Sequence, residues 1–253
     1  MTMYAAYFSP TGGTEKVDKA LMEGFGGSYE TIDFLTLGTK AWSRTFQPDD
    51  FVVAVIPVYG GRVPVTAARH ISNMTGSGAK AVAVAVFGNR AIDDALLELR
   101  NLLSAAGFDV RAGIAAVAEH SIFRMYATGR PDAEDIQDLH AFADSIKASL
   151  DQPGTLQVPG NYPYKPKRPS ANQPKADDSC IACMICAEEC PEQAIDPEDV
   201  QNVNPEKCIA CLHCVSVCPV KARNVNQEVI AERAPKLQET FGPRKPNTLF
   251  LPH

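Results

Sequence analysis

The first 150 residues alternate between short apolar runs and segments with helical periodicity. The run at 51–58 is apolar throughout, so we expect a strand that is buried on both faces of a sheet. Further strands are predicted at 2–8, 28–34, 79–87 and 108–118, and helices at 14–25, 92–106 and 132–149. This alternation predicts an α/β domain with a five-stranded, doubly wound parallel sheet, which binds ligands at the carboxyl ends of its strands.

Each predicted helix carries an apolar stripe that would face the sheet. The helix at 132–149 opens with Asp132, Glu134 and Asp135, acidic residues that suit a helix N-terminus. Gly107 is expected to end the helix at 92–106. The three stripes are Val17, Leu21 and Phe25; Leu96, Leu99, Leu102, Leu103 and Ala106; and Ile136, Leu139, Phe142, Ile146 and Leu150.

The rest of the chain divides into three segments. Residues 151–177 hold prolines with Lys165, Lys167, Arg168 and Lys175 between them, which predicts a semi-extended linker. Residues 178–225 contain every cysteine and form a separate module. Residues 226–253 are a proline-containing tail that we expect to run over another part of the molecule. The predicted domains are therefore 1–150 and 178–225.

Charge and hydropathy exclude several classes of partner. The formal net charge of −6 argues against nucleic acid and anionic membranes, because both select for basic patches. No run of about 18 apolar residues exists to span a membrane, and the first ten residues do not resemble a signal peptide. We expect a cytoplasmic protein, in which disulfides are disfavoured.

The eight cysteines form two copies of the motif C-x2-C-x2-C-x3-C-P, shifted by 28 residues. Three cysteines on one tight loop can reach three corners of a cubane cluster, and the fourth ligand comes from the other copy. The spacing therefore predicts two [4Fe–4S] clusters with exchanged fourth ligands. One set is Cys180, Cys183, Cys186 and Cys218; the other is Cys208, Cys211, Cys214 and Cys190.

The alternative is a pair of structural zinc sites, although zinc modules usually combine two separated C-x2-C pairs rather than triplets. Residues 178–225 closely resemble bacterial-type two-cluster ferredoxins, α+β domains, and this resemblance implies outer-sphere transfer of single electrons. His213 lies inside the second loop and is expected at the surface rather than as a ligand.

The turn after the first strand is rich in hydroxyl groups and glycine. Such a turn at a helix N-terminus can bind a phosphate dianion through hydroxyls and backbone N–H groups. An ordinary threonine cap after a glycine-rich turn would look similar. The residues concerned are Ser9, Pro10, Thr11, Gly12, Gly13 and Thr14.

Two more loops follow strands and would lie beside the first. An aromatic ring such as that of Tyr59 can stack on a planar cofactor, and glycines allow backbone amides to reach its polar edge. The three loops resemble those of flavodoxins, with the motif S/T-x-T-G-x-T, and the resemblance implies FMN. By it, Ser9, Thr11, Gly12, Gly13 and Thr14 hold the phosphate, and Pro57, Val58, Tyr59, Gly60, Gly61, Phe87, Gly88, Asn89 and Arg90 frame the ring.

The loops depart from the usual flavodoxin pattern because they carry Arg62 and Arg90 and no tryptophan. One hypothesis is that these cations raise the flavin potential; the alternative is that both are solvated. Glu119, His120, Phe123 and Arg124 follow the fifth strand and either close over the flavin or form a plain connection. Trp42 is expected to pack in the core.

The order of the parts resembles the EFR-type flavodoxin–ferredoxin fusion proteins of anaerobic bacteria and archaea. That resemblance implies an electron-transfer protein with FMN and two [4Fe–4S] clusters, served by redox partner proteins. No G-x-G-x-x-G motif supports a direct NAD(P)H site. The alternatives are an FMN-dependent reductase of a small substrate and a docking scaffold with an empty flavin loop.

Overall fold

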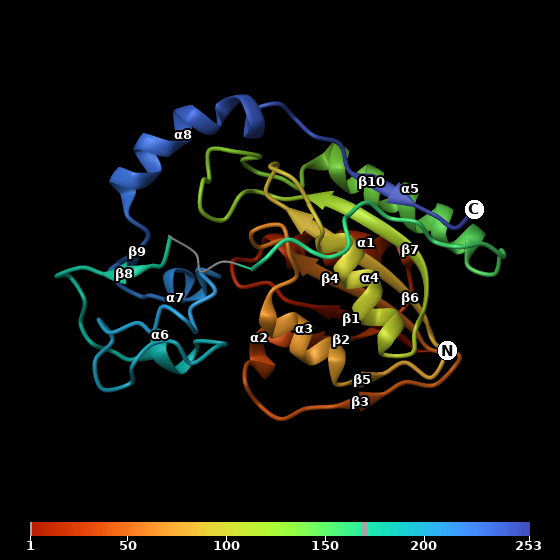
Figure 1. The fold of residues 1–253 in the computed structure, drawn as a ribbon, viewed down its shortest axis with the longest axis horizontal. Helices are drawn as coiled ribbons and strands as arrows, with labels where there is room; N and C mark the ends of the chain where they lie inside the picture. The colour runs from red at the N-terminus through yellow and green to blue at the C-terminus, as the bar shows by residue number, and fades with distance from the viewer. Residues whose placement is uncertain (1, 168–171) are drawn as a thin grey trace.

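In the computed structural model, which describes residues 2–167 and 172–253, five parallel strands form the centre of the N-terminal part (Figure 1). Their order across the sheet is β2-β1-β4-β6-β7. The direction of winding reverses between β1 and β4, which places a ligand crevice at the carboxyl ends of those two strands. The five predicted strands are confirmed, each to within a residue at either end: β1 (Met3–Tyr7), β2 (Tyr29–Asp33), β4 (Phe51–Pro57), β6 (Lys80–Phe87) and β7 (Asp109–Val117).

Helices cover both faces of this sheet. Helices α1 (Gly13–Phe25) and α5 (Ala133–Ser149) pack on one face, where Val53 and Val55 of β4 point. Helices α3 (Val65–Ser72) and α4 (Ala95–Ala105) pack on the other, where Val52, Ala54 and Ile56 point. Strand β4 is apolar at every position because each of its faces meets a helix. The short elements α2 (Phe34–Leu37), β3 (Arg44–Thr45) and β5 (Met74–Thr75) complete this part, and Trp42 packs edge-on against Phe34.

Helix α5 buries most of the predicted stripe, since Leu139 and Ile146 are buried and Phe142 and Leu150 pack against the core, but Ile136 is an exception. Ile136 is exposed, and the buried positions are Asp135, Leu139, Ala143, Ile146 and Ser149. Asp135 is buried because it forms an ion pair with Arg130, which is equally buried. The predicted N-terminus is confirmed, since the side chains of Asp132 and Asp135 form a reciprocal capping box.

The tail forms two elements that the hydrophobic pattern does not predict. Helix α8 (Gln227–Phe241) leaves the cysteine module and passes over the N-terminal part, as Figure 1 shows. Strand β10 (Thr248–Phe250) then pairs antiparallel with β7 and becomes the sixth strand of the sheet. Asn247 fixes this strand, since its Oδ1 accepts a hydrogen bond from the Val117 main chain at 2.9 Å.

The proline-rich segment lies against the N-terminal part. Between 151 and 167 it contains neither helix nor strand. Asp94, before α4, accepts hydrogen bonds from the main-chain N–H groups of Asn161, at 2.9 Å, and Lys165, at 2.7 Å. The predicted linker residues Arg168 and Pro169 lie outside the described residues. The domain limits at 150, 177 and 225 stay predictions.

The cysteine module is built from short elements. They are α6 (Ile185–Glu188), α7 (His213–Ser216) and an antiparallel pair, β8 (Lys175–Ala176) with β9 (Arg223–Asn224). Within the described residues, no helix is both long and apolar enough to cross a membrane.

One buried carboxyl on α1 makes stability depend on pH. Asp18 is 1% exposed, and burial raises its pKa to about 7. The folded state therefore holds this proton more tightly than the unfolded state, and stability is lost as the pH rises from about 4 to about 7.

We expect Asp18→Asn to be more stable than the wild type at about pH 8, by up to about 4 kcal/mol, and equally stable near pH 4. Denaturant unfolding at both pH values measures the difference. Glu23→Gln removes an exposed charge from the same helix and is the control. A difference that does not change with pH would contradict the assignment.

Candidate cofactor sites

The loop after β1 leads directly into helix α1. Gly12 has a left-handed φ of 83°, and nothing lies within 4 Å of where its Cβ would be. The Oγ of Ser9 accepts a hydrogen bond from the main-chain N–H of Glu15 at 2.8 Å, which ties the loop to the first helical turn. Ser9 and Thr14 are buried, whereas Thr11 is exposed. Because glycine brings no capping side chain, the N-terminus of α1 offers backbone donors that fit a phosphate.

The loop after β4 makes a tight reversal. Tyr59 and Arg62 exchange main-chain hydrogen bonds of 3.0 and 3.1 Å around Gly60 and Gly61, both with positive φ. Two successive positive φ values are the geometry of a type I′ turn, which glycine supplies without strain. The half-buried ring of Tyr59 packs edge-on against Phe8, with the ring centroids 6.4 Å apart. Pro57 and Val58 lead into this turn, and Val58 bonds to Val86 of the neighbouring strand.

Each arginine of these loops pairs with a carboxylate. Arg62 forms a bidentate pair with Glu98, with both N···O distances 2.8 Å. Arg90 pairs with Asp93, which also binds Lys165. Each positive charge therefore has a carboxylate partner, and the effect of these residues on a flavin potential stays a prediction.

The loop after β6 is held by the tail. The Nδ2 of Asn89 donates to the main-chain oxygens of Phe241 and Pro243, and its Oδ1 accepts from the Lys245 N–H. Any contact of Asn89 with a flavin ring would therefore have to come from its main-chain atoms. Phe87 is buried, and Gly88 packs so closely on His120 that a Cβ would lie 2.8 Å from it.

The segment after β7 packs beneath the tail. His120 stacks on Phe241 with ring centroids 5.6 Å apart, and Phe123 and Tyr126 complete the cluster. Burial lowers the pKa of His120 to about 4, so the ring is neutral at neutral pH. Its Nδ1 accepts from the main-chain N–H groups of Ile122 and Phe123, which leaves the proton on Nε2. Arg124 and Glu119 form an ion pair at 2.7 Å.

The eight cysteines are free thiols that line two separate cavities. The first cavity is lined by Cys190, Cys208, Cys211 and Cys214, and we call it the flavin-side cavity. The second is lined by Cys180, Cys183, Cys186 and Cys218, and we call it the outer cavity. Each cavity draws three thiols from one copy of the motif and the fourth from the other copy, the same grouping that the spacing predicts. Among the described residues, no three Cys, His, Asp or Glu side chains converge on a single metal ion.

The two motif copies share their backbone conformation. Positive φ values occur at Ala182 and Met184 in the first copy and at Ala210 and Leu212 in the second. They recur after the prolines, at Gln193 and Lys221. All three pairs are 28 residues apart, so the sequence repeat is also a structural repeat. Left-handed residues within a loop turn successive N–H groups toward one side and form an anion-binding concavity, which fits a negatively charged cluster.

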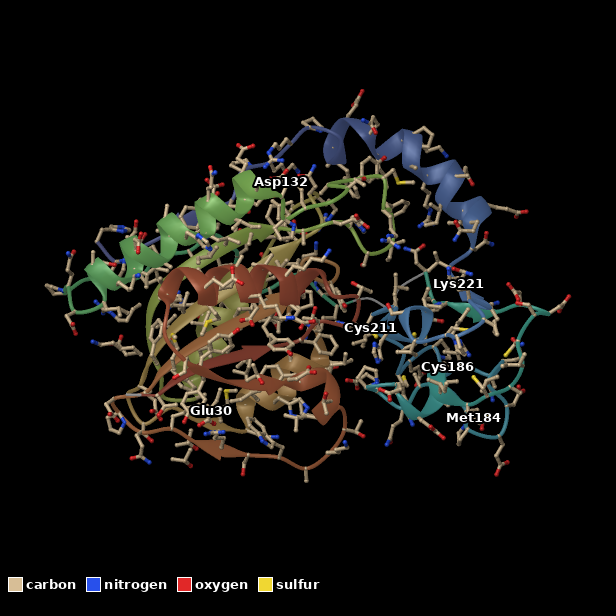
Figure 2. All side chains as sticks on the ribbon, turned by 180° about the vertical axis from the view of Figure 1, so that it is seen from behind. Glu30, Asp132, Met184, Cys186, Cys211 and Lys221 are labelled. Atoms are coloured by element: carbon tan, nitrogen blue, oxygen red, sulfur yellow. The ribbon has the colours of Figure 1, made fainter. Side chains whose placement is uncertain are left out.

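The flavin-side cavity faces the N-terminal part. Cys211 is 9% exposed and belongs to the same hydrophobic core as Phe8, and the ring of Tyr59 packs against that core. Burial raises the pKa of the Tyr59 hydroxyl well above its usual value, with a smaller contribution from Cys211. Figure 2 shows Cys211 on the side of the module nearer the sheet and Cys186 farther away. Burial also raises the pKa of the Cys214 thiol to about 12, which the positive charge of Arg223 opposes.

Polar contacts fix the module against the N-terminal part. The Nδ1 of His213 lies 3.1 Å from the main-chain oxygen of Pro10, inside the candidate phosphate loop. Glu192 accepts hydrogen bonds from Thr66 and Arg69 of α3, the latter at 2.6 Å. His213 is thus a contact between the two parts, not the surface residue that the sequence predicts.

A comparison of the two motif copies could have found these residues. At a shift of 28, His213 corresponds to Ile185, Glu192 to Val220, and Arg223 to Ile195. Each pair places a polar residue opposite an apolar one. Two equivalent cluster-binding halves would not require a polar residue in one half where the other half has an apolar one. We therefore infer that His213, Glu192 and Arg223 have a role beyond the binding of a cluster.

Residues 179–222 match the family model of the 4Fe-4S dicluster domain. The match covers the eight cysteines and supports two [4Fe–4S] clusters in this module. No curated protein matches the sequence.

The N-terminal part is similar to solved flavodoxins. A Streptococcus pneumoniae TIGR4 flavodoxin is 14% identical, with a TM-score of 0.40, and the match covers 58% of this chain and 99% of that one. Oxidised Flavodoxin 2 from Bacillus cereus is 15% identical, with a TM-score of 0.41 and the same coverages. Rubredoxin oxygen:oxidoreductase from Desulfovibrio gigas is 18% identical, with a TM-score of 0.39, over 59% of this chain and 37% of that one.

The strand order of the sheet is independently the flavodoxin-like order. The chain therefore combines a sheet of flavodoxin-like strand order with a 4Fe-4S dicluster domain, an arrangement that fits a flavodoxin–ferredoxin fusion.

Proposed function

We propose that this chain is an electron-transfer protein that binds FMN and two [4Fe–4S] clusters and exchanges electrons with redox partner proteins. The observation that carries the proposal is the shared core of Cys211 and Tyr59, a cysteine of the flavin-side cavity and an aromatic residue of the candidate ring loop. Both candidate sites therefore border one continuous hydrophobic core, and His213 contacts the candidate phosphate loop through the main-chain oxygen of Pro10.

FMN supplies chemistry that the clusters lack, because a flavin accepts two electrons and can release them singly, whereas each cluster carries one. The chain's own residues would bind and orient the cofactor. Ser9, Thr11, Gly12, Gly13 and Thr14 would hold the phosphate at the N-terminus of α1. The turn at Tyr59 and the main chain after Phe87 would frame the ring.

The outer cavity offers a contact site for a partner. Cys183 is exposed, as are the neighbouring apolar side chains of Ile181 (61%) and Val220 (41%). Cys211, in contrast, faces the protein interior. The proposed route therefore joins the flavin site to the outer cavity through the flavin-side cavity. Reduction of a small substrate is less well supported, because the tail holds the second ring loop through Asn89.

Cofactor analysis of anaerobically purified protein tests the proposal. We expect FMN, iron and acid-labile sulfide in the ratio of one flavin to two clusters, and bleaching of the flavin by electrons that first reduce the clusters. Stoichiometric zinc without sulfide would contradict the iron–sulfur part, and protein without flavin would contradict the FMN part. Turnover of small acceptors faster than transfer to protein partners would favour a reductase.

Tyr59 provides a specific test of the flavin site. We expect Tyr59→Leu to weaken FMN binding about tenfold, because an aromatic contact contributes about 0.5–1.5 kcal/mol beyond its buried area. Tyr59→Phe keeps the ring and should bind FMN as the wild type does. Titration of apoprotein with FMN, followed by fluorescence quenching, measures both. If Tyr59→Leu bound FMN as tightly as the wild type, the flavin ring would not contact Tyr59.

A further inference from the structure

The cysteine module presents an apolar surface around the outer cavity. Ile181 and Val220 are large apolar side chains that remain exposed there. Met184 lines the same cavity and lies on the side of the module away from the sheet, as Figure 2 shows. Contiguous exposed apolar patches mark contact sites. We call this surface the outer face, and its residues, all of them exposed, are Ile181, Ala182, Cys183, Pro219 and Val220.

The repeat contains the same face a second time, and there it is covered. Shifted by 28 residues, the five positions of the outer face become Ile209, Ala210, Cys211, Pro191 and Glu192. Three of these counterparts are buried and the other two are half-buried, whereas every residue of the outer face is exposed. The difference between the two copies is therefore one of environment, because their backbone conformations match.

The N-terminal part of the chain covers the counterpart face. Cys211 belongs to the hydrophobic core of that part, and Ile209 packs against the same core. The carboxylate of Glu192 accepts a hydrogen bond from Arg69 of α3 at 2.6 Å. The module thus already uses this face once, as the surface by which its second motif copy docks onto a neighbouring domain.

The outer face differs from its counterpart in the residues that make polar contacts. Val220 takes the place of Glu192. Beside the face, Ile185 takes the place of His213. Both replaced residues contact the N-terminal part through polar atoms. A protein on the outer face is therefore held by apolar contact without these polar contacts, which suits the weak, short-lived complexes of electron transfer.

The rim of the outer face is acidic. Among the described residues, the exposed lysines within three positions along the chain of a residue that lines the outer cavity are Lys175 and Lys221. The exposed carboxylates within the same limit are Asp177, Asp178, Glu188, Glu189, Glu198 and Asp199. A second copy of this chain would bring like charges together at this rim, whereas a basic surface would complement it.

We propose that the outer face docks a redox protein whose cofactor lies beneath an apolar patch that is surrounded by lysine and arginine residues. This inference rests on the iron–sulfur part of the proposed function and names the class of its partner. One electron passes between the outer cluster and the partner's cofactor, so one is oxidised and the other reduced, with no bond made or broken. The exposed Cys183 brings the outer cavity to the contact.

The test measures binding of a probe, a lysine-rich cytochrome c, to the anaerobic holoprotein. Both proteins are oxidised, so calorimetric titration at low ionic strength reports binding without electron transfer. We expect Ile181→Ser and Val220→Ser each to weaken binding about fivefold or more, because each removes apolar area that the contact buries. Added salt should weaken the wild-type complex. The rate at which reduced holoprotein reduces the cytochrome should fall in parallel.

Two controls separate the apolar and the charged parts of the contact. Ile136→Ser is the matched variant, because it makes the same change at an exposed isoleucine on α5 of the N-terminal part. It should bind the cytochrome as the wild type does. Succinylated cytochrome c carries carboxylates in place of its lysine charges and should lose its binding to the wild type.

No binding by the wild type, or unchanged binding in both Ile181→Ser and Val220→Ser with their clusters intact, would overturn the outer face as the docking site. Equal binding of the succinylated cytochrome would overturn the basic character of the partner. A wild-type dimer that Ile181→Ser dissociates, detected by sedimentation, would assign the face to a second copy instead. Wild-type protein without acid-labile sulfide would contradict the proposed function itself.

Discussion

Replacing Arg130 by methionine is expected to destabilise the protein by about 3–5 kcal/mol, because it leaves the carboxylate of Asp135 buried without its partner. The two side chains are 4% and 1% exposed, and Arg130 Nε donates to Asp135 Oδ2 at 2.8 Å. Arg130 also donates to the main-chain oxygen of Lys245 at 2.8 Å, and Asn247 donates to Asp135 at 2.9 Å. The pair therefore joins helix α5 to the tail as well as to its own loop.

The loss should depend on pH. Burial alone would raise the pKa of Asp135, but hydrogen bonds from Arg130, the Asp132 main chain and Asn247 outweigh it and hold the pKa below its usual value. Stability from this group is present above the unfolded pKa, about 4, and is lost as the pH falls through the lower folded value. The wild type should therefore lose much of its advantage over Arg130→Met in acid.

Denaturant unfolding of both proteins at neutral and acid pH measures this difference. Lys19→Met is the control, since Lys19 pairs with Glu15 within helix α1 but its side chain is 60% exposed. An exposed pair of this kind contributes about 0.2–1 kcal/mol. Asp135→Asn should recover part of the loss when added to Arg130→Met. Equal costs for Arg130→Met and Lys19→Met would contradict the importance of burial.

Cys190→Ala and Cys218→Ala should each abolish one cluster and halve the iron content, and the lost cluster should belong mainly to the other motif copy. This result follows from the cavities, since Cys190 lines the one formed by Cys208, Cys211 and Cys214. A cubane with three protein ligands readily loses iron or fails to assemble.

Double variants distinguish exchanged from unexchanged ligands. Cys190→Ala combined with Cys211→Ala should lose no more iron than either change alone, because both thiols line one cavity. Cys190→Ala combined with Cys183→Ala should lose both clusters, although these two cysteines share a motif copy. Iron and sulfide analysis, together with EPR, measures how many clusters each double variant retains. The reverse pattern would show that each copy holds its own cluster.

The sheet and the cysteine groups were predictable from the sequence because local pattern determines both. A strand such as 51–58 is apolar at each position only when it is covered on both faces, and cysteine spacing limits which thiols one loop can bring together. The exposure of Ile136 on α5 was not predictable in this way. Asp135 replaces Ile136 in the core because of Arg130, and the helical pattern carries no information about that partner.

The tail was unpredictable for a related reason. Thr248–Phe250 is too short to be recognised as a strand, and its pairing with β7 depends on a surface assembled far earlier in the chain. His213 and Arg223, in contrast, carry a signal in the sequence. Each is polar where the other motif copy has isoleucine, so an alignment of the two copies is enough to distinguish both positions.

Strand β10 changes how the cysteine module is attached. The module enters the chain after α5 and leaves it before β10, and both of these elements belong to the same sheet domain. The module is therefore a domain inserted into the chain and connected to the sheet domain at both ends, not a terminal domain on a single linker. An electron-carrier domain on one flexible linker has to diffuse and dock against its partner domain again for every electron, at a rate governed by its effective concentration. A doubly anchored insertion holds the cysteine module beside the proposed flavin site, so we expect any electron transfer between cofactors bound there to be insensitive to solvent viscosity.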